Sequence, residues 1–400
     1  MESKWEQCKL GDAVTLKRGY DLPTDDRNDG KVPIVSSSGI TGSHDSAKVE
    51  APGVVTGRYG TLGEVFYMKQ DFWPLNTALY VENFHENHPR FIHYFLQTIN
   101  FEQQNAASSV PGVNRNHLHK LEVQIPPLPV QRRIADILGA YDDLIANNRR
   151  RIELLEEMAT AIFREWFVHY RFPGHADVEM RETDMGAVPD AEGWTVKPIG
   201  ELATSPRSRV DPDEMDPDTP YFGLGDMPKE SIALSKWGRA EDAGSKKYSF
   251  DRGNILFGKI RPYFHKVGPA PVAGICSTDA IVIVPNTDEL WGFVLGHVSS
   301  DEFVELADQT SSGTKMPRAK WKILKKEYKV AVPPYSLLRQ FNDTMQNIVD
   351  QIHNLIHRNN TLRETRDLLL PRLLSDTTAT EGIPDSILNH EYKKDKSSTV

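Results

Sequence analysis

Apolar residues recur at alternating spacings of four and three along two long stretches of the chain. The first stretch runs from Val130 to His169, and the second begins at Phe341 and ends at Leu373. Because this heptad spacing persists over several repeats, it predicts two long helices that pair through apolar seams as in a coiled coil. The seam residues are Ile134, Leu138, Tyr141, Ile145, Asn148 and Ile152 in the first helix, and Phe341, Met345, Ile348, Ile352, Leu355 and Asn359 in the second.

Proline and serine positions predict where these helices begin and end. Pro129 suits the first turn of a helix, where its missing N–H is not needed. Ser336 is a candidate N-cap of the second helix, and Pro371 predicts a kink or an end near residue 371.

Each seam contains one asparagine, Asn148 in the first and Asn359 in the second. A buried polar residue at a seam position costs stability but can determine the register and orientation of the pair. The alternative is that both residues lie at frayed or exposed ends of the seam. The sequence leaves both interpretations open.

The sequence before the second seam repeats the sequence before the first. "VVTGRYG" from Val54 resembles "ILFGKIR" from Ile255, a shift of 201 positions, and "ALYV" from Ala78 matches "AIVI" from Ala280, a shift of 202. "LEVQIPP" ending at Pro127 matches "YKVAVPP" ending at Pro334, a shift of 207. Collinear matches with a growing shift indicate a duplicated unit with small insertions in the second copy.

This repeat predicts an α+β chain of two mostly β globules, each followed by a long helix. Short apolar runs bounded by Gly and Pro favour strands in both globules, and a polar segment with Gly and Pro separates the two copies. The predicted parts are a globule over 1–127, a helix over 128–170, a linker over 171–193, a globule over 194–334, a helix over 335–374 and a polar, mobile tail over 375–400.

Catalytic and metal-binding patterns are missing from the sequence. It has no P-loop and no Gly-rich strand-to-helix fingerprint for a dinucleotide or for S-adenosylmethionine. His353 and His357 stand four residues apart on the second helix, but no third ligand accompanies them, so we expect exposed polar positions and no metal. The two cysteines, Cys8 and Cys276, lie far apart, which favours a reduced, cytoplasmic setting, and no apolar run is long enough for a membrane span.

The stretch "VAVPPYS" (330–336) resembles the Asn/Asp-Pro-Pro-Tyr motif of amino-group DNA methyltransferases. Position 332 is valine, which has no polar group to hold an amine. At the equivalent place the first copy has Ile125-Pro126-Pro127-Leu128. Leucine therefore stands there in place of the tyrosine of the motif. The shared feature is Pro-Pro between an apolar strand and a long helix, which predicts a rigid joint.

Basic residues cluster locally although the net charge of the chain is −9. Seven lysines and arginines fall between positions 315 and 329, opposed only by Glu327, which suits a phosphate-contacting surface. The matching turns of the two copies and the loop before the first Pro-Pro add side chains that can contact bases or backbone. The candidate DNA-binding residues are Arg58, Tyr59, Asn114, Arg115, Asn116, Lys259, Arg261, Tyr263, Lys315, Arg318, Lys320 and Lys322. A solvated helix face or surface ion pairs would explain any one of them equally well.

The pattern resembles the specificity (S) subunits of type I restriction–modification systems. The resemblance rests on the paired "IPPLPVQRRIADIL" (125–138) and "VPPYSLLRQF" (332–341), and on "IELLEEMATAIFREWFVHYRFPG" (152–174) and "LRETRDLLLPRLLS" (362–375). It covers nearly the whole chain. It implies two target-recognition domains, each reading one half of a split sequence in double-stranded DNA, with the two helices packed antiparallel as a spacer of pseudo-twofold symmetry.

The same resemblance implies partners and a missing activity. The helices would dock two methyltransferase (modification) subunits, and restriction (translocase) subunits would join the complex. The chain would have no catalytic residues and no cofactor, and S-adenosylmethionine, ATP and magnesium would bind to the partner subunits.

Two rival functions are a stand-alone DNA methyltransferase, or the fused recognition half of one, and a coiled-coil scaffold. The first needs a cofactor-binding α/β domain of roughly 200 residues, which the sequence does not show. The second does not need duplicated globules with Arg, Asn and Tyr in their loops.

Overall fold

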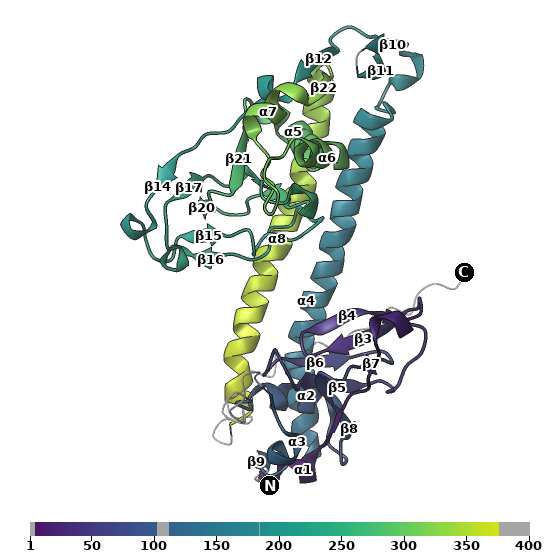
Figure 1. Ribbon diagram of the computed structural model, residues 1–400, viewed down its shortest axis with the longest axis vertical. Coiled ribbons are helices and arrows are strands. Elements are labelled where there is room, and N and C mark those ends of the chain that lie inside the picture. The colour runs from purple at the N-terminus through teal and green to yellow at the C-terminus, as the bar shows by residue number, and fades with distance from the viewer. Residues whose placement is uncertain (1–4, 102–111, 184, 376–400) are drawn as a thin grey trace, which may run out of the picture. The chain divides into compact units, whose positions relative to one another are not determined.

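Two long helices, α4 (Leu128–Phe163) and α8 (Tyr335–Leu373), are the main elements of the structure, a computed structural model (Figure 1). The structure describes residues 5–101, 112–183 and 185–375. The predicted tail over 375–400 therefore lies almost wholly outside the described residues. Both helices begin and end close to the predicted positions, and α4 continues into a π-helical turn, η3 (Arg164–Val168).

Contacts divide the chain into two compact units. Unit 1 consists of Met1–Ile145 and Thr361–Val400, and unit 2 consists of Ala146–Asn360. Each unit therefore combines one globule with a segment of α4 and a segment of α8.

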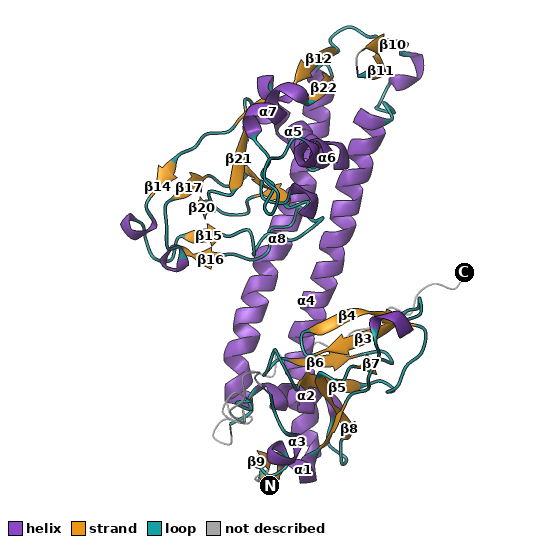
Figure 2. Cartoon of the chain, in the orientation of Figure 1, coloured by secondary structure: helices purple, strands orange, loops and turns teal. Residues whose placement is uncertain are grey.

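Within its described residues, unit 1 contains three small sheets and three short helices (Figure 2). A four-stranded antiparallel sheet has the order β2-β8-β5-β6, a three-stranded sheet has the order β4-β3-β7, and β1 pairs with β9. The strands are β1 (Glu6–Lys9), β2 (Thr15–Arg18), β3 (Val32–Ser36), β4 (Gly39–His44), β5 (Gly53–Gly57), β6 (Val65–Met68), β7 (Trp73–Pro74), β8 (Ala78–Asn83) and β9 (Glu122–Ile125). The helices are α1 (Leu10–Ala13), α2 (Pro89–Gln97) and α3 (Arg115–Leu118), with a 3₁₀ turn η1 (Thr24–Asp26).

Unit 2 has a corresponding set of sheets. Its four-stranded sheet has the order β13-β21-β18-β19, a five-stranded sheet has the order β14-β17-β20-β15-β16, and β12 pairs with β22. The strands are β12 (Thr195–Pro198), β13 (Ala203–Thr204), β14 (Arg209–Val210), β15 (Pro220–Phe222), β16 (Gly238–Arg239), β17 (Lys247–Phe250), β18 (Ile255–Gly258), β19 (Val267–Pro269), β20 (Gly274–Cys276), β21 (Ala280–Pro285) and β22 (Lys329–Val332). The helices are α5 (Trp291–Val298), α6 (Asp301–Gln309) and α7 (Trp321–Glu327), with short turns η5 (Ile199–Glu201), η6 (Pro212–Glu214), η7 (Ala240–Asp242), η8 (Pro262–Phe264) and η9 (Asp288–Leu290).

The four-stranded sheets of the two globules share strand order and strand direction. In each four-stranded sheet a central strand whose residues are all buried, β5 or β18, pairs antiparallel with neighbours on both sides. Such continuous apolar runs are typical of strands covered on both faces. Each second sheet also contains one parallel pair, β3 with β7 in unit 1 and β15 with β20 in unit 2.

The core of each unit includes residues of both long helices. In unit 1, Ile134 and Leu138 of α4 and Leu373 of α8 share a core with the apolar face of α2. In unit 2, the core joins α5 to both helices through residues such as Phe163 and Phe341. The heptad seams thus pack against the globules as well as against each other.

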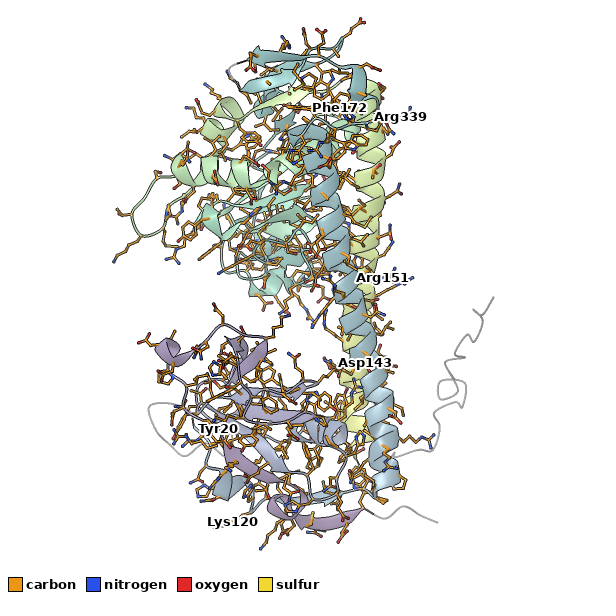
Figure 3. All side chains as sticks on the ribbon, turned by 90° about the vertical axis from the view of Figure 1, so that its right-hand side faces the viewer. Tyr20, Lys120, Asp143, Arg151, Phe172 and Arg339 are labelled. Carbon is orange, nitrogen blue, oxygen red and sulfur yellow. The ribbon has the colours of Figure 1, made fainter. Side chains whose placement is uncertain are left out.

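Polar contacts fasten the first globule to α4 in unit 1. Asp143, labelled in Figure 3, accepts hydrogen bonds from Arg90 of α2 (2.9 Å) and from Lys69 (2.6 Å). These bonds, with Arg90 the larger cause, lower the pKa of Asp143 to about 2. Arg90 also donates to the carbonyl of Gly139, where a Cβ atom would come within 2.6 Å of the guanidinium.

The Pro-Pro stretches form the predicted joints between strand and helix. β22 ends at Val332 and α8 begins at Tyr335, while β9 ends at Ile125 and α4 begins at Leu128. The Pro334 carbonyl accepts the backbone N–H groups of Leu337 and Leu338, so it starts the hydrogen bonding of the helix.

Two expectations from the sequence are wrong. Ser336 lies inside the first turn of α8 and is not its N-cap, because the helix already begins at Tyr335. His353 is buried against the carbonyl of Pro269, although His357 is exposed as expected.

The segment between the two copies, residues 171–193, has structure of its own. It contains a 3₁₀ turn, η4 (His175–Asp177), and a hairpin of β10 (Met180–Thr183) and β11 (Gly186–Pro189). Its apolar residues Phe172 and Val188 are buried in the core of unit 2.

Candidate nucleic-acid interface

The turn after β5 carries the first pair of predicted residues, Arg58 and Tyr59. The Arg58 guanidinium lies 4.4 Å from the centre of the Tyr59 ring and donates to the carbonyl of Asn76 at 3.3 Å. Tyr59 is 43 % exposed, so its ring lies at the surface beside the Arg58 guanidinium. Nearby, Asp21 accepts hydrogen bonds from the side chains of Asn76 and Arg18.

The turn after β18 carries the second group, Lys259, Arg261 and Tyr263. Lys259 Nζ lies 3.5 Å from Asp279 Oδ1, and Arg318 Nε lies 3.4 Å from the same oxygen. Arg261 donates to the carbonyl of Lys315 at 3.4 Å. The structure therefore brings Lys259 and Arg261 together with Lys315 and Arg318, although more than fifty residues separate the two pairs in sequence.

Arg261 has an unusual backbone conformation. Its φ of 49° places it in the left-handed region, which residues other than Gly, Asn and Asp adopt rarely. Its N–H donates to the carbonyl of Pro317, and Pro262 follows it directly as the first residue of η8. These constraints hold the turn against the 311–318 loop, and strained residues of this kind concentrate at functional sites.

The same backbone bridge supports both turns. In unit 1 the Arg58 N–H donates to Thr77 O (2.9 Å), and the Val113 N–H donates to Arg58 O (3.0 Å). In unit 2 the Lys259 N–H donates to Asp279 O (3.0 Å), and the Ala319 N–H donates to Lys259 O (2.8 Å). Each turn thus lies between the start of a buried strand, β8 or β21, and the segment that leads into a short helix, α3 or α7.

The remaining predicted residues lie on these short helices. Asn114 is the N-cap of α3, and its Oδ1 accepts the N–H of Asn116 at 2.9 Å, so this oxygen has a structural partner. Arg115 and Asn116 are exposed in α3. Lys320 precedes α7 and Lys322 lies in its first turn, and both are exposed.

Asp279 and Thr77 are the site residues that the sequence prediction missed. Each directly precedes the matched apolar strand, "AIVI" or "ALYV", so the alignment of the two copies marks both positions. Their importance depends on the pairing of strands with distant loops, which the sequence does not reveal.

The predicted seam residues are buried, with the exception of Tyr141, which is half-buried. Asn148 Nδ2 donates to Asn359 Oδ1 at 2.9 Å inside unit 2. In unit 1, Arg366 of α8 forms an ion pair with Asp142 of α4, which also accepts a hydrogen bond from Tyr94. The interpretation of both asparagines as exposed seam ends is therefore wrong.

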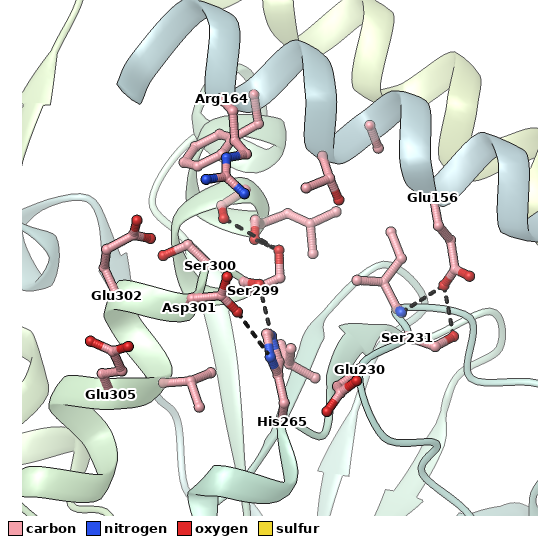
Figure 4. Close-up of a pocket in the computed structure, with 18 of the residues that line it drawn as sticks. Glu156, Arg164, Glu230, Ser231, His265, Ser299, Ser300, Asp301, Glu302 and Glu305 are labelled. Carbon is pink, nitrogen blue, oxygen red and sulfur yellow. Dashed lines mark hydrogen bonds and ion pairs between the residues drawn. The ribbon is translucent and has the colours of Figure 1, made fainter. Parts of the chain in front are cut away.

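A cavity of about 580 Å³ in unit 2 lies between α4, α6 and η8 (Figure 4). Glu156 of α4 accepts hydrogen bonds there from Ser231 Oγ (2.7 Å) and from the backbone N–H groups of Ile232 and Ala233. Burial nevertheless raises the pKa of this carboxyl group above its usual value. His265 contacts the Ser299 carbonyl (2.8 Å) and Asp301 (3.6 Å), so these contacts lie within the globule, while those of Glu156 join the globule to α4.

No cluster of three or more His, Cys, Asp or Glu side chains within residues 5–101, 112–183 and 185–375 could hold a metal ion. No helix in these ranges combines the length and the apolar composition that a membrane span requires.

Comparisons with known proteins give consistent results. The sequence matches the family described as type I restriction modification DNA specificity domain over residues 2–157 and again over residues 191–367. The type I restriction enzyme MjaIX specificity subunit of Methanocaldococcus jannaschii is 23% identical over 310 residues, covering 71% of this chain and 68% of that protein. The type I restriction enzyme EcoDI specificity subunit of Escherichia coli is 21% identical over 408 residues, covering 94% and 89%.

A solved structure has the same fold. The crystal structure of the S subunit of a type I restriction-modification system from M. genitalium superposes with a TM-score of 0.59 at 16% identity, covering 94% of this chain and 97% of that one.

Proposed function

The chain belongs to the family of type I restriction–modification DNA specificity proteins, and from this membership we propose that it reads a split DNA target with one half-site for each globule. Specificity subunits of this family recognise DNA and are not catalytic, so the chain is not an enzyme by itself. The rival interpretation of the chain as a methyltransferase is set aside with this assignment.

Bipartite reading draws its main support from the duplicated basic turn. Arg58 and Lys259 occupy equivalent places at the end of a buried strand, each bridged to the next strand and to the segment before a short helix. Two globules whose four-stranded sheets have the same strand order, each with such a turn, suit two half-sites of different sequence.

The proposed contacts comprise phosphate contacts and base contacts. Lysines of the 315–322 segment suit phosphates, because a lysine ammonium acts as a point charge. Arginines suit base edges, where the guanidinium can donate two bonds to a guanine. The assigned residues are Arg58, Tyr59, Arg115, Asn116, Lys259, Arg261, Tyr263, Lys315, Arg318, Lys320 and Lys322, together with the amide nitrogen of Asn114.

The two long helices form the proposed spacer, an antiparallel coiled coil. Within unit 2, Asn148 contacts Asn359, while Phe163, farther along α4, contacts Phe341, which lies earlier on α8. This opposite order of contacts supports antiparallel packing. A pseudo-twofold relation between the copies would give two equivalent surfaces for two methyltransferase subunits.

The complex would act in the cytoplasm on double-stranded DNA. Restriction (translocase) subunits would join the two methyltransferases, and those partners would supply S-adenosylmethionine, ATP and magnesium. The specificity chain would contribute DNA recognition and the geometry of assembly.

Co-expression with a candidate methyltransferase subunit tests this proposal. The purified complex is expected to methylate a split, asymmetric motif, located by sequencing the methylated DNA, and each protein alone is expected to leave the DNA unmethylated. Methylation by this chain alone, or a continuous motif without a gap, would contradict the proposal.

A further inference from the structure

We propose that Asp279 is a positioning residue that determines how the second globule discriminates its half-site. Its carboxylate holds Lys259 and Arg318 in one arrangement and offsets their charge until DNA is present. This inference rests on the proposed function, because it concerns the cations assigned to DNA contact.

The geometry of the site is that of one carboxylate shared by two cations. Asp279 Oδ1 lies 3.5 Å from Lys259 Nζ and 3.4 Å from Arg318 Nε, and the side chain of Asp279 remains 32 % exposed. Lys259 Nζ also donates to the carbonyl of Thr278 (2.5 Å), and Arg318 Nη1 approaches the carbonyl of Met316 (3.5 Å). Both cationic groups are therefore restrained from several sides.

The fold of the bridge does not need the Asp279 carboxylate. Only the backbone carbonyl of Asp279 accepts the Lys259 N–H, and its N–H donates to Ser277 Oγ. In the first globule Thr77 makes the same backbone bond to Arg58, without an acidic group. The backbone bridge therefore forms with a neutral residue in the first globule, and it does not require the negative charge at position 279.

Stability is a weak explanation for this charge as well. Ion pairs between partly exposed side chains contribute little to stability, because solvent screens the attraction and the side chains lose freedom. A carboxylate beside a DNA-contacting surface also weakens attraction to phosphates. Its remaining effect is on the orientation of Arg318. Asp279 engages the Nε of Arg318, and Nη1 approaches the Met316 carbonyl, so the Nη2 end of the guanidinium is left for a base edge.

We expect the Asp279 carboxylate to raise discrimination of the second half-site and to lower the affinity for unrelated DNA. With the carboxylate present, the cations are partly neutralised and are oriented for one donor pattern. Without it, they are free to follow any nearby phosphate, so binding to unrelated DNA rises while discrimination falls.

The test uses Asp279→Asn and Asp279→Thr in the complex with the methyltransferase subunit. Asp279→Thr introduces the residue that the equivalent bridge of the first globule contains, so the fold should tolerate it. We expect discrimination between the correct and a single-base-changed second half-site to fall about tenfold or more. The slope of log affinity against log salt for unrelated DNA should steepen by about one. First half-site discrimination should be unchanged.

Two controls separate positioning from other effects. Asp218→Asn removes an exposed carboxylate that pairs with Arg239 at 3.3 Å in the same unit, and it should change neither readout. In an Arg318→Gln, Lys259→Gln background, Asp279→Asn should have no further effect, because a positioning residue acts only through the groups it holds.

Unchanged discrimination and an unchanged salt slope in both Asp279 variants would overturn the inference, as would an equal loss at both half-sites. If the wild-type complex fails to methylate a split motif, the proposed function itself is wrong. If the wild-type complex methylates a split motif and both Asp279 variants discriminate as the wild type does, only the role of Asp279 is contradicted.

Discussion

His353 shows how burial gives one residue a predictable effect on stability. It lies inside unit 2 with Nε2 3.3 Å from the carbonyl oxygen of Pro269, so the neutral ring carries its proton on Nε2 and donates to that oxygen. Desolvation lowers the pKa of His353 to about 4. In the unfolded chain the ring titrates near its ordinary value of about 6.5.

The sign of the resulting pH dependence follows from these two values. Above about pH 6.5 the ring is neutral in both states, and the residue adds no pH dependence. As pH falls from 6.5 towards 4, the unfolded chain binds the proton first, so the free energy of unfolding decreases, by at most ~1.4 kcal/mol per pH unit. His93 and His297 are also buried, and burial lowers their pKa values to about 4 and about 3, so they act in the same direction.

The variant His353→Gln should therefore flatten part of the stability loss between pH 6.5 and 4, measured by thermal or denaturant unfolding. His357→Gln is the matched control, because His357 lies one turn farther along α8 and is exposed. A pH profile that His353→Gln leaves unaltered would show that this ring is already protonated or hydrated in the folded protein.

For single residues, the charge of a turn can be predicted from the sequence, but the burial and the partners of a side chain cannot. The basic character of the turn after β18 is readable from Lys259 and Arg261, because their charges need no structural context. The burial of His353 is not readable, since it depends on contact with Pro269, a residue distant in sequence. Asp279 escapes prediction for the same reason, because the Arg318 that it holds lies on another loop.

Among the elements, the contact between α4 and α8 in unit 2 includes a buried polar pair, Asn148 and Asn359. Both side chains are almost fully buried, and each satisfies the other. A single Asn148→Leu substitution leaves the Asn359 amide buried without this partner, which costs roughly 1–3 kcal/mol. The double substitution to leucine should recover most of that loss and can exceed wild-type stability, because the buried polar pair is replaced by apolar contact.

Denaturant unfolding of the wild type, both single variants and the double variant measures this coupling. Asn347→Leu serves as the control, because Asn347 is exposed on α8 and its side chain donates to the Asp343 carbonyl one turn away in the same helix. It should change stability by no more than about 0.5 kcal/mol. Additive effects of the two seam substitutions would contradict a direct interaction between the asparagines.

The long helices are the elements that the sequence predicts best. Their periodicity is local and repeated many times, so α4 and α8 begin within a few residues of the expected positions. The strands are shorter, and several, such as β13 and β14, contain only two residues. The sequence does not predict the hairpin of β10 and β11, because its strands have only four residues each and the segment is held by the packing of Phe172 and Val188 against distant core residues.

For the whole molecule, modular reading of DNA predicts the result of exchanging a globule. Replacing residues 1–125 with the globule of another specificity subunit, with the joint at Pro126 and Pro127 kept, should change one half-site and leave the other intact. Sequencing of methylated DNA gives both half-sites in one measurement. The reciprocal exchange of residues 194–332 should change the other half-site, and a change in both half-sites from either exchange would contradict independent reading.

The helices predict how the gap between half-sites responds to their length. Seven added residues lengthen an α-helix by about 10 Å, which is close to the length of three base pairs of DNA at ~3.4 Å each. One heptad inserted into both α4 and α8, near Asn148 and Asn359, should therefore widen the gap by about three base pairs while both half-sites stay the same. An insertion into α4 alone should instead displace Asn148 from Asn359 and reduce stability, since the two seams no longer match. As the control, a variant with a different heptad of the same length and apolar spacing should keep the original gap. If the paired insertion yields an active complex with the original gap, the helices do not act as the ruler, and the spacing must be set by the methyltransferase subunits.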